Sequence, residues 1–350
     1  MVNEYILLVS SSYILHAIAC LERKGISTDK YCSENNINSA HLKNYHAFVP
    51  MQQVKSFYTS IIMGENLPEL GLILGREYTI TSHGMAGVAA ISQENIFDFI
   101  KVCTDLLSLR FPAIKATIIE DEDEFGVRLE EVFPLGLGVP FVIEMSFLVI
   151  CEMHRLLFPG DEDKLHFRFN FKAPAYSDLY AGYFGENVTF CSEYCEIRIE
   201  NNRKYKRLSH HDPINSQMFF EKFMSDMPQV NKNNIYERML KMIRLPSGKF
   251  MGQEEMSAMF SLSPRSFRRK LQESGSTFQD IINIEKRKCA IYYLIHTTMK
   301  ITDISASLYF SDSSHFTKAF KSWVGISPSE YRSENQRSLV SMESANSTLV

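Results

Sequence analysis

The sequence predicts an α+β domain over residues 1–228, a linker region over 229–248 and an all-helical domain over 249–337. Three observations support this division. Residues 1–67 have apolar positions at three- and four-residue intervals, whereas residues 68–228 mix helical spacing with strand alternation. The chain turns polar around MPQVNKNN (227–234), which is typical of a linker. Beyond Gly248, every segment has helical spacing up to Arg337.

Two helices of the first domain are well marked. Glu94–Phe111 is amphipathic, and Pro112 stops it because proline cannot continue a helix. Phe141–Phe158 is apolar almost all round, so we expect a buried helix that ends at Pro159.

The strands of the first domain are predicted from alternation and turn composition. In Leu165–Lys172 the odd positions are apolar and the even ones polar, as in a half-buried strand. The acidic turn Glu120–Glu124 separates two short apolar runs, which predicts a hairpin. The other expected strands are Lys115–Ile119, Phe125–Val132, Val188–Phe190 and Cys195–Ile199.

Composition indicates a folded protein, with 45% apolar and 22% charged residues. Seven cysteines without regular spacing argue against a disulfide framework and for a reducing cytosol. The first 25 residues have neither a basic leader nor a cleavage site, so we expect a soluble, cytoplasmic protein without membrane association. The net charge of −4 hides an asymmetry: residues 245–337 carry +4 and residues 1–244 carry −7. The tail 338–350 has no packing pattern, and we expect it to be disordered.

The C-terminal domain contains two segments of the form helix, tight turn, helix. The first consists of Gln253–Phe260, a turn, and Pro264–Ser274, with Ser263 as N-cap and Pro264 at the first helical position. The second consists of Ile301–Leu308, a turn at Tyr309–Ser311, and Asp312–Val324. The sequence therefore predicts two helix-turn-helix motifs.

In such a motif the second helix enters the major groove of DNA and presents its N-terminal residues to base edges. Arginine can bond guanine or phosphate bidentately, while Phe267 and Leu271 on the opposite face can pack inward. Phe316, Phe320, Trp323 and Tyr331 are expected in the core. The candidate DNA-binding residues are Arg265, Arg268, Arg269, Gln272, Ser313, Ser314, His315, Thr317 and Lys318.

The segment Ser276–Thr297 has helical spacing and no breaker, so a linking helix joins the two motifs. Twenty helical residues span about 30 Å, close to the roughly 34 Å between successive major-groove faces. The two second helices can therefore contact consecutive grooves of one duplex.

The run from Met256 to Arg332 resembles the AraC/XylS family of transcription regulators. The matching residues are Ile301, Ile304, Phe310, Phe316, Phe320, Lys321, Gly325, Pro328, Tyr331 and Arg332. The sequence departs from the family pattern at three positions: Ser305 replaces alanine, Lys286 replaces arginine, and Tyr309 replaces the glycine of the turn. A left-handed backbone at Tyr309 would cost about 1–2 kcal/mol.

The first domain resembles, less specifically, the sensor and dimerisation domain of OruR- and VirS-like regulators in that family. The resemblance rests on His83-Gly84-x-x-Gly87, the helix from Glu94 and the stretch from Ala173 to Phe190. It implies a DNA-binding transcription regulator, either an activator or a repressor, which binds double-stranded promoter or operator DNA and a small-molecule effector. Effector residues cannot be assigned, no cofactor is implied, and homodimerisation and contact with RNA polymerase stay open.

Other interpretations of the first domain remain. It could be an enzyme, although no nucleophile, phosphate loop or metal motif is clustered in it, or a domain that only binds another protein. Cys191 and Cys195 could hold a metal with His210 and His211, but packing is the simpler interpretation. The acidic run Glu120–Glu124 is better explained as a solvated turn than as a calcium or catalytic site. The aromatic residues between 141 and 190 could line an effector pocket or form plain core.

Overall fold

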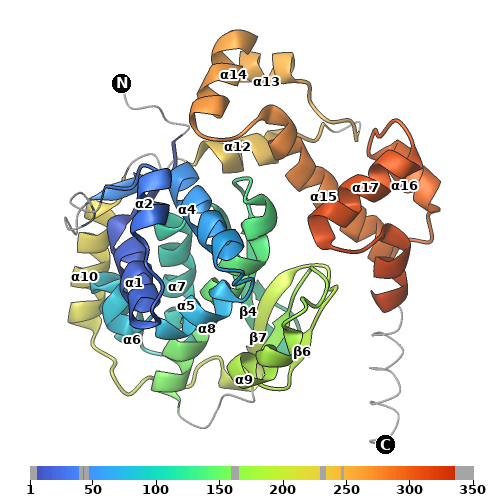
Figure 1. Ribbon diagram of the computed structural model, residues 1–350. Coiled ribbons are helices and arrows are strands. Elements are labelled where there is room, and N and C mark those ends of the chain that lie inside the picture. The colour runs from blue at the N-terminus through green and yellow to red at the C-terminus, as the bar shows by residue number, and fades with distance from the viewer. Residues whose placement is uncertain are drawn as a thin grey trace, which may run out of the picture.

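The computed structural model describes residues 6–38, 42, 47–158, 165–228, 234–245 and 248–335. The N-terminal half gathers helices around a sheet, and the C-terminal helices extend away from it (Figure 1). The predicted disordered tail lies outside the described residues.

The helices of the N-terminal half include the two that the sequence marks most clearly. The predicted helix at Glu94–Phe111 is α7, which Asn95 caps by accepting a hydrogen bond from the backbone N–H of Asp98 at 3.0 Å. The predicted helix at Phe141–Phe158 is α8, most of whose residues are buried. The helices are α1 (Ser11–Arg23), α2 (Asp29–Glu34), α4 (Met51–Gly64), α5 (Leu70–Glu77), α6 (Met85–Ile91), α7 (Ile96–Arg110), α8 (Val139–Leu157), α9 (Tyr180–Phe184) and α10 (Pro213–Asp226).

A five-stranded mixed sheet has the order β3-β4-β7-β5-β6, in which only the β5–β6 pair is parallel. The predicted hairpin and the later strands are all present. The alternation of Leu165–Lys172 is confirmed, since Phe167 and Phe169 are buried and His166 and Arg168 are partly exposed, but only three of these residues pair as a strand. The strands are β3 (Ile114–Glu120), β4 (Glu124–Glu131), β5 (His166–Arg168), β6 (Val188–Thr189) and β7 (Cys195–Glu200).

A small antiparallel sheet, β1 (Leu8–Ser10) with β2 (Phe48–Pro50), was not predicted for the mostly helical residues 1–67. Strands of three residues are too short to show alternation, and their pairing joins positions 40 residues apart.

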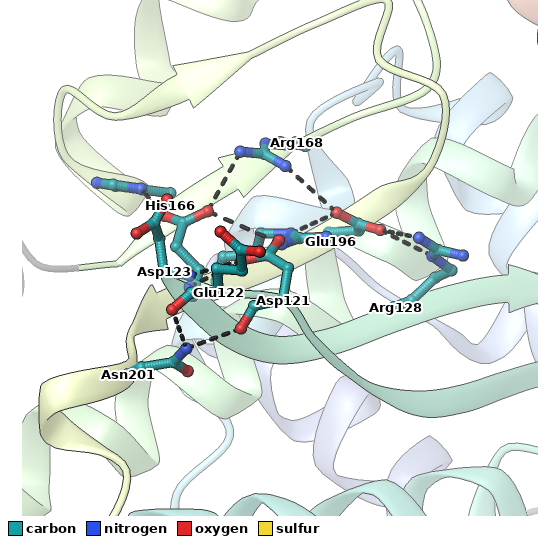
Figure 2. A network of polar contacts seen from close by, with 10 residues as sticks. Asp121, Glu122, Asp123, Arg128, His166, Arg168, Glu196 and Asn201 are labelled. Atoms are coloured by element: carbon teal, nitrogen blue, oxygen red, sulfur yellow. Dashed lines mark hydrogen bonds and ion pairs between the residues drawn. The ribbon is translucent and has the colours of Figure 1, made fainter.

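One face of the large sheet holds a network of charges (Figure 2). Buried Glu196 of β7 pairs with Arg128 at 2.6 Å and with Arg198 at 2.7 Å. Arg198 also contacts Asp121, and Glu124 contacts His166. The acidic run is thus the predicted exposed turn, but basic side chains of neighbouring strands neutralise part of it.

The C-terminal helices are α12 (Ile235–Met242), α13 (Gln253–Met259), α14 (Pro264–Glu273), α15 (Phe278–His296), α16 (Ile301–Ser307) and α17 (Ser313–Val324). Helix α12 lies in the predicted linker region. Its Tyr236 is fully buried, packs on Phe133 at 5.1 Å between ring centroids and shares a hydrogen bond of 2.8 Å with Ser276. This segment is packed because Ile235, Tyr236 and Met239 have helical spacing, which the neighbouring asparagines obscure. The domain limits themselves stay a prediction.

Candidate nucleic-acid interface

The first motif closes as its sequence predicts. The Ser263 hydroxyl accepts a hydrogen bond from the backbone N–H of Ser266 at 3.2 Å, which caps α14, and Pro264 occupies the first turn. Phe267 and Leu271 are buried, and Phe267 stacks on Phe260 at 6.2 Å between ring centroids. The inward face of α14 is therefore fixed, and the opposite face is left to solvent.

That outer face carries the predicted arginines. Arg265, Arg268, Arg269 and Gln272 are all exposed. Arg269 forms an ion pair of 2.9 Å with Glu273, one turn further along the helix. Within the described part of the chain, Arg265 and Arg268 have no ion-pair partner, so their guanidinium groups are available to an external anion.

The second motif is capped by Asp312, whose carboxylate accepts a hydrogen bond from the His315 backbone N–H at 2.7 Å. This hydrogen bond holds the pKa of Asp312 below its usual value. Phe316 and Phe320 are buried as predicted, whereas Trp323 is only partly buried.

The outward side of α17 carries mainly uncharged polar side chains. Ser314, His315 and Lys318 are exposed, and Ser313 and Thr317 are partly exposed. The Thr317 hydroxyl donates to the Ser313 carbonyl at 2.8 Å. Thr317 therefore has an internal partner, and Lys318 is the only lysine or arginine among the candidates on this helix.

Tyr309 adopts the left-handed backbone that its position requires, with φ of 57°. Ser261 occupies the same place in the first motif, with φ of 54°. Both turns close with matching hydrogen bonds: Ser261 N–H donates to Ala258 at 2.9 Å, and Tyr309 N–H donates to Ala306 at 3.0 Å. Tyr309 thus leaves the turn geometry of the second motif intact, at the cost of backbone strain.

The other two departures from the family pattern support this turn. The Ser305 hydroxyl donates to the Asp312 carbonyl at 2.9 Å. The Lys286 ammonium donates to the Tyr309 carbonyl at 3.3 Å and lies 4.2 Å from the centroid of the Phe310 ring. Burial lowers the pKa of Lys286. Lys286 therefore fastens the linking helix to the second turn.

Helix α15 connects the motifs, which lie at its two ends (Figure 1). Its 19 residues span about 28 Å. The same helix contacts the N-terminal sheet: Arg287 pairs with Glu131 at 2.6 Å, and Lys288 pairs with Glu130 at 3.0 Å. These contacts could not be predicted from the sequence, because charges more than 150 residues apart give no local signal of pairing.

A third contact joins the end of the second motif to the N-terminal half. The buried Tyr331 hydroxyl donates to the Ser192 carbonyl at 2.5 Å. His296, at the end of α15, pairs with Glu193 at 2.6 Å. The C-terminal domain is therefore held to the sheet at several points along α15 and beyond it.

Cys191 and Cys195, considered above as metal ligands, have other partners. The Cys191 thiol donates to Glu334 at 2.8 Å, and the Cys195 thiol donates to the Asn170 side chain at 3.1 Å. In the described part of the chain no group of three or more candidate ligands is placed to hold a metal ion. Nor is any described helix both long and apolar enough to cross a membrane.

Two family models match the chain. Residues 256–334 match a helix-turn-helix domain. Residues 25–202, more than half of the chain, match the N-terminal arabinose-binding domain of AraC transcription regulators. The chain belongs to the AraC family of transcription regulators. It combines a DNA-binding helix-turn-helix domain with an N-terminal domain of the ligand-binding type, as its sequence predicts.

Curated relatives align with this chain along most of their length. The ornithine utilization regulator of Pseudomonas aeruginosa is 24% identical over 82% of this chain and 84% of its own. The HTH-type transcriptional regulator VirS of Mycobacterium tuberculosis is 24% identical over 76% of this chain and 78% of its own. The crystal structure of the transcriptional regulator CdpR from Pseudomonas aeruginosa is 17% identical, covers 87% of this chain and 96% of its own, and superposes with a TM-score of 0.40.

Proposed function

We propose that this AraC-type regulator contacts its operator with the outer faces of α14 and α17, and that a small molecule bound in residues 1–228 controls that contact. The observation that carries the proposal is the state of Arg265 and Arg268. They are exposed and without an ion-pair partner in the described chain, on a helix whose opposite face is buried.

The two helices would contribute differently to DNA recognition. The first turns of a recognition helix contact base edges, and α14 presents Arg265 and Arg268 there, with Arg269 and Gln272 beside them. Helix α17 presents Ser314 and His315 in its first turn. Hydroxyls bond several bases and the phosphates, so α14 should carry more of the base specificity.

Control by an effector would act through α15. This helix joins the motifs and contacts the N-terminal sheet through the Arg287–Glu131 pair. A ligand that binds one arrangement of sheet and helix better than another shifts the population toward it. Promoter activation, a homodimer, contact with RNA polymerase, a cytoplasmic location and the absence of enzymatic activity stay predictions.

The test begins with genome-wide mapping of the sites bound by the full-length protein, followed by fluorescence anisotropy on the strongest site. Replacing Arg268 and Arg269 with alanine should weaken operator binding at least about tenfold, since a bidentate arginine contributes about 1–3 kcal/mol. The control is Arg207→Ala, which removes an exposed arginine from the N-terminal half. Unchanged operator binding by the double variant would show that the proposed DNA-contacting face is wrong.

A further inference from the structure

Two adjoining cavities lie among the N-terminal helices and share His83, Ala86 and Arg110. The larger has a volume of about 780 Å³ and the smaller about 50 Å³. Pockets of several hundred Å³ suit small ligands. The smaller cavity has apolar walls that include Leu106, Val149 and Met153.

The glycine motif of the sequence places His83 between these cavities. His83 ends the short 3₁₀ helix η1 (Ile80–His83), and Gly84 follows with φ of 55°. A Cβ atom at Gly87 would lie 2.3 Å from the Ile80 carbonyl oxygen. Both glycines are therefore required for α6 to fold back tightly onto η1, which holds the His83 ring at the cavity wall.

Two buried nitrogen atoms at this junction have no hydrogen-bond partner in the described chain. They are Nε2 of His83 and Nε of Arg110. His83 is 8% exposed; its Nδ1 shares a hydrogen bond of 3.0 Å with the Tyr13 hydroxyl, and its carbonyl accepts one of 2.5 Å from Arg110. Buried polar atoms without partners are costly, so the pair indicates a place for a ligand.

The charge at this junction favours an anion. Arg110 lies 4.8 Å from the centroid of the Tyr13 ring and 5.6 Å from that of Phe223. No carboxylate lines either cavity among the residues described. Burial, with Arg110 nearby, lowers the pKa of His83 to about 3, so its ring is neutral. When the Tyr13 hydroxyl donates to Nδ1, Nε2 carries the ring proton and is a donor.

We propose that these cavities bind an organic monocarboxylate with an apolar body, its carboxylate on Arg110 and His83 and its body along the apolar walls. One fixed cation with neutral donors matches a single negative charge, and guanidinium suits a carboxylate. An amino acid with two ammonium groups would find no carboxylate to pair with them, because none lines either cavity among the residues described. The inference deepens the proposed function, because it names the class of effector.

A third hollow, of about 320 Å³, lies between the sheet and α15 and is the rival site. Its Glu131 and Glu130 are already paired with Arg287 and Lys288. Helix α8 lines both places, with Val149 at the small cavity and Ile143 at the hollow beside α15. Helix α8 therefore extends from the proposed carboxylate site to the hollow that the linking helix borders.

The test is isothermal titration calorimetry on the full chain with hexanoate, octanoate and phenylacetate as probes, and with ornithine and methyl octanoate as comparisons. At least one carboxylate should bind, and octanoate should bind about tenfold more tightly than its uncharged ester, because hydrogen bonds to charged groups contribute about 1.5–3 kcal/mol. Ornithine should not bind. No binding by any of the three carboxylates, or equal binding of octanoate and the ester, overturns the proposal.

Variants localise the site. Arg110→Gln should weaken carboxylate binding about tenfold, whereas Arg76→Gln, which removes an arginine from the face of Tyr183 outside both cavities, should not. If Arg110→Gln lacks the wild-type circular dichroism, Ala19→Phe decides: Ala19 is exposed on α1 and lines the larger cavity, so a phenyl ring there should block binding without disturbing the core. Wild-type binding by both folded variants overturns the assignment.

Operator binding without ligand is measured in parallel by fluorescence anisotropy. If the wild-type protein binds its operator but none of the carboxylates, this inference fails while DNA recognition through α14 and α17 stands. If replacing Arg268 and Arg269 with alanine leaves operator binding unchanged, the proposed interface fails whatever the calorimetry shows.

Discussion

Glu131 of β4 and Arg287 of α15 form an ion pair of 2.6 Å between the N-terminal sheet and the helix that joins both DNA-binding motifs. Both side chains are nearly buried, at 4% and 12% exposed, and the second carboxylate oxygen of Glu131 accepts a hydrogen bond from the Leu135 backbone N–H at 2.6 Å. Arg287→Met leaves a buried carboxylate without its cation. We expect a loss of about 3 kcal/mol in the free energy of unfolding, measured by urea titration.

The neighbouring pair is a matched control. Lys288 and Glu130 are 29% and 24% exposed, so Lys288→Met should cost less than about 1 kcal/mol. Adding Glu131→Gln to Arg287→Met should recover most of the stability, because the unpaired charge is gone. Equal losses from Arg287→Met and Lys288→Met would show that the Glu131 pair is not a special link between the domains.

Tyr309 lies in a strained turn, and replacing it with glycine has two opposing effects on stability. Its φ of 57° strains any residue other than glycine, and its side chain is 52% exposed. Tyr309→Gly should therefore stabilise the protein by about 1 kcal/mol or less, because the relief of about 1–2 kcal/mol is offset by the greater freedom of glycine in the unfolded chain. Ser261→Gly, at the matching turn, should behave alike, and thermal unfolding of both variants checks this. Destabilisation by both would mean that the turns are not strained.

The elements that were predicted correctly depend on local pattern. Asn95 and Pro112 bracket α7, and Phe167 and Phe169 alternate with polar neighbours in and beyond β5. Ser263 likewise marks the start of α14. In each case the residues that decide the structure lie within a few positions of one another, so that spacing alone carries the information.

The features that escaped prediction depend on distant partners. In the sequence Lys286 is only a departure from arginine, because its contact with the Tyr309 carbonyl joins residues 23 positions apart and forms only when the chain folds. His83 belongs to a glycine motif that is visible in the sequence, but its neighbour Arg110 comes from the far end of α7. Complementarity between single residues so far apart produces no periodicity in the sequence.

Glu144 of α8 predicts a pH dependence of stability. It is fully buried; one of its carboxylate oxygens accepts hydrogen bonds from the Tyr176 hydroxyl, at 2.7 Å, and from the Tyr180 hydroxyl, while the other has no partner in the described chain. Burial raises the pKa of Glu144 from 4.5 to about 8. The folded state then keeps a proton that the unfolded state loses, so stability falls as the pH rises from about 4.5 to about 8.

Glu144→Gln removes the titrating group, so that its proton no longer contributes to the pH dependence of stability. The difference in unfolding free energy between variant and wild type should move in favour of the variant by on the order of 1 kcal/mol per pH unit across this window. Urea titrations at several pH values measure it, and other titrating groups cancel in the difference. Tyr176→Phe, which removes a donor to the carboxylate, should keep the slope and move its upper end to higher pH. A pH-independent difference for Glu144→Gln would place the pKa of Glu144 near its ordinary value.

The carboxylate of Glu273 pairs with the guanidinium group of Arg269, which we propose contacts DNA. The two form an exposed ion pair on α14, and such a pair contributes only about 0.3–0.5 kcal/mol. Glu273→Gln should therefore barely change stability, but it releases the guanidinium and removes one negative charge from a helix that we propose contacts DNA phosphates. We expect DNA affinity to rise about two- to fivefold. The gain should be larger at low salt, because salt ions screen the added attraction. Anisotropy titrations at several salt concentrations measure this, with Arg269→Ala as the background in which Glu273→Gln should gain less. An affinity that Glu273→Gln leaves unchanged at every salt concentration would place this turn of α14 away from the DNA.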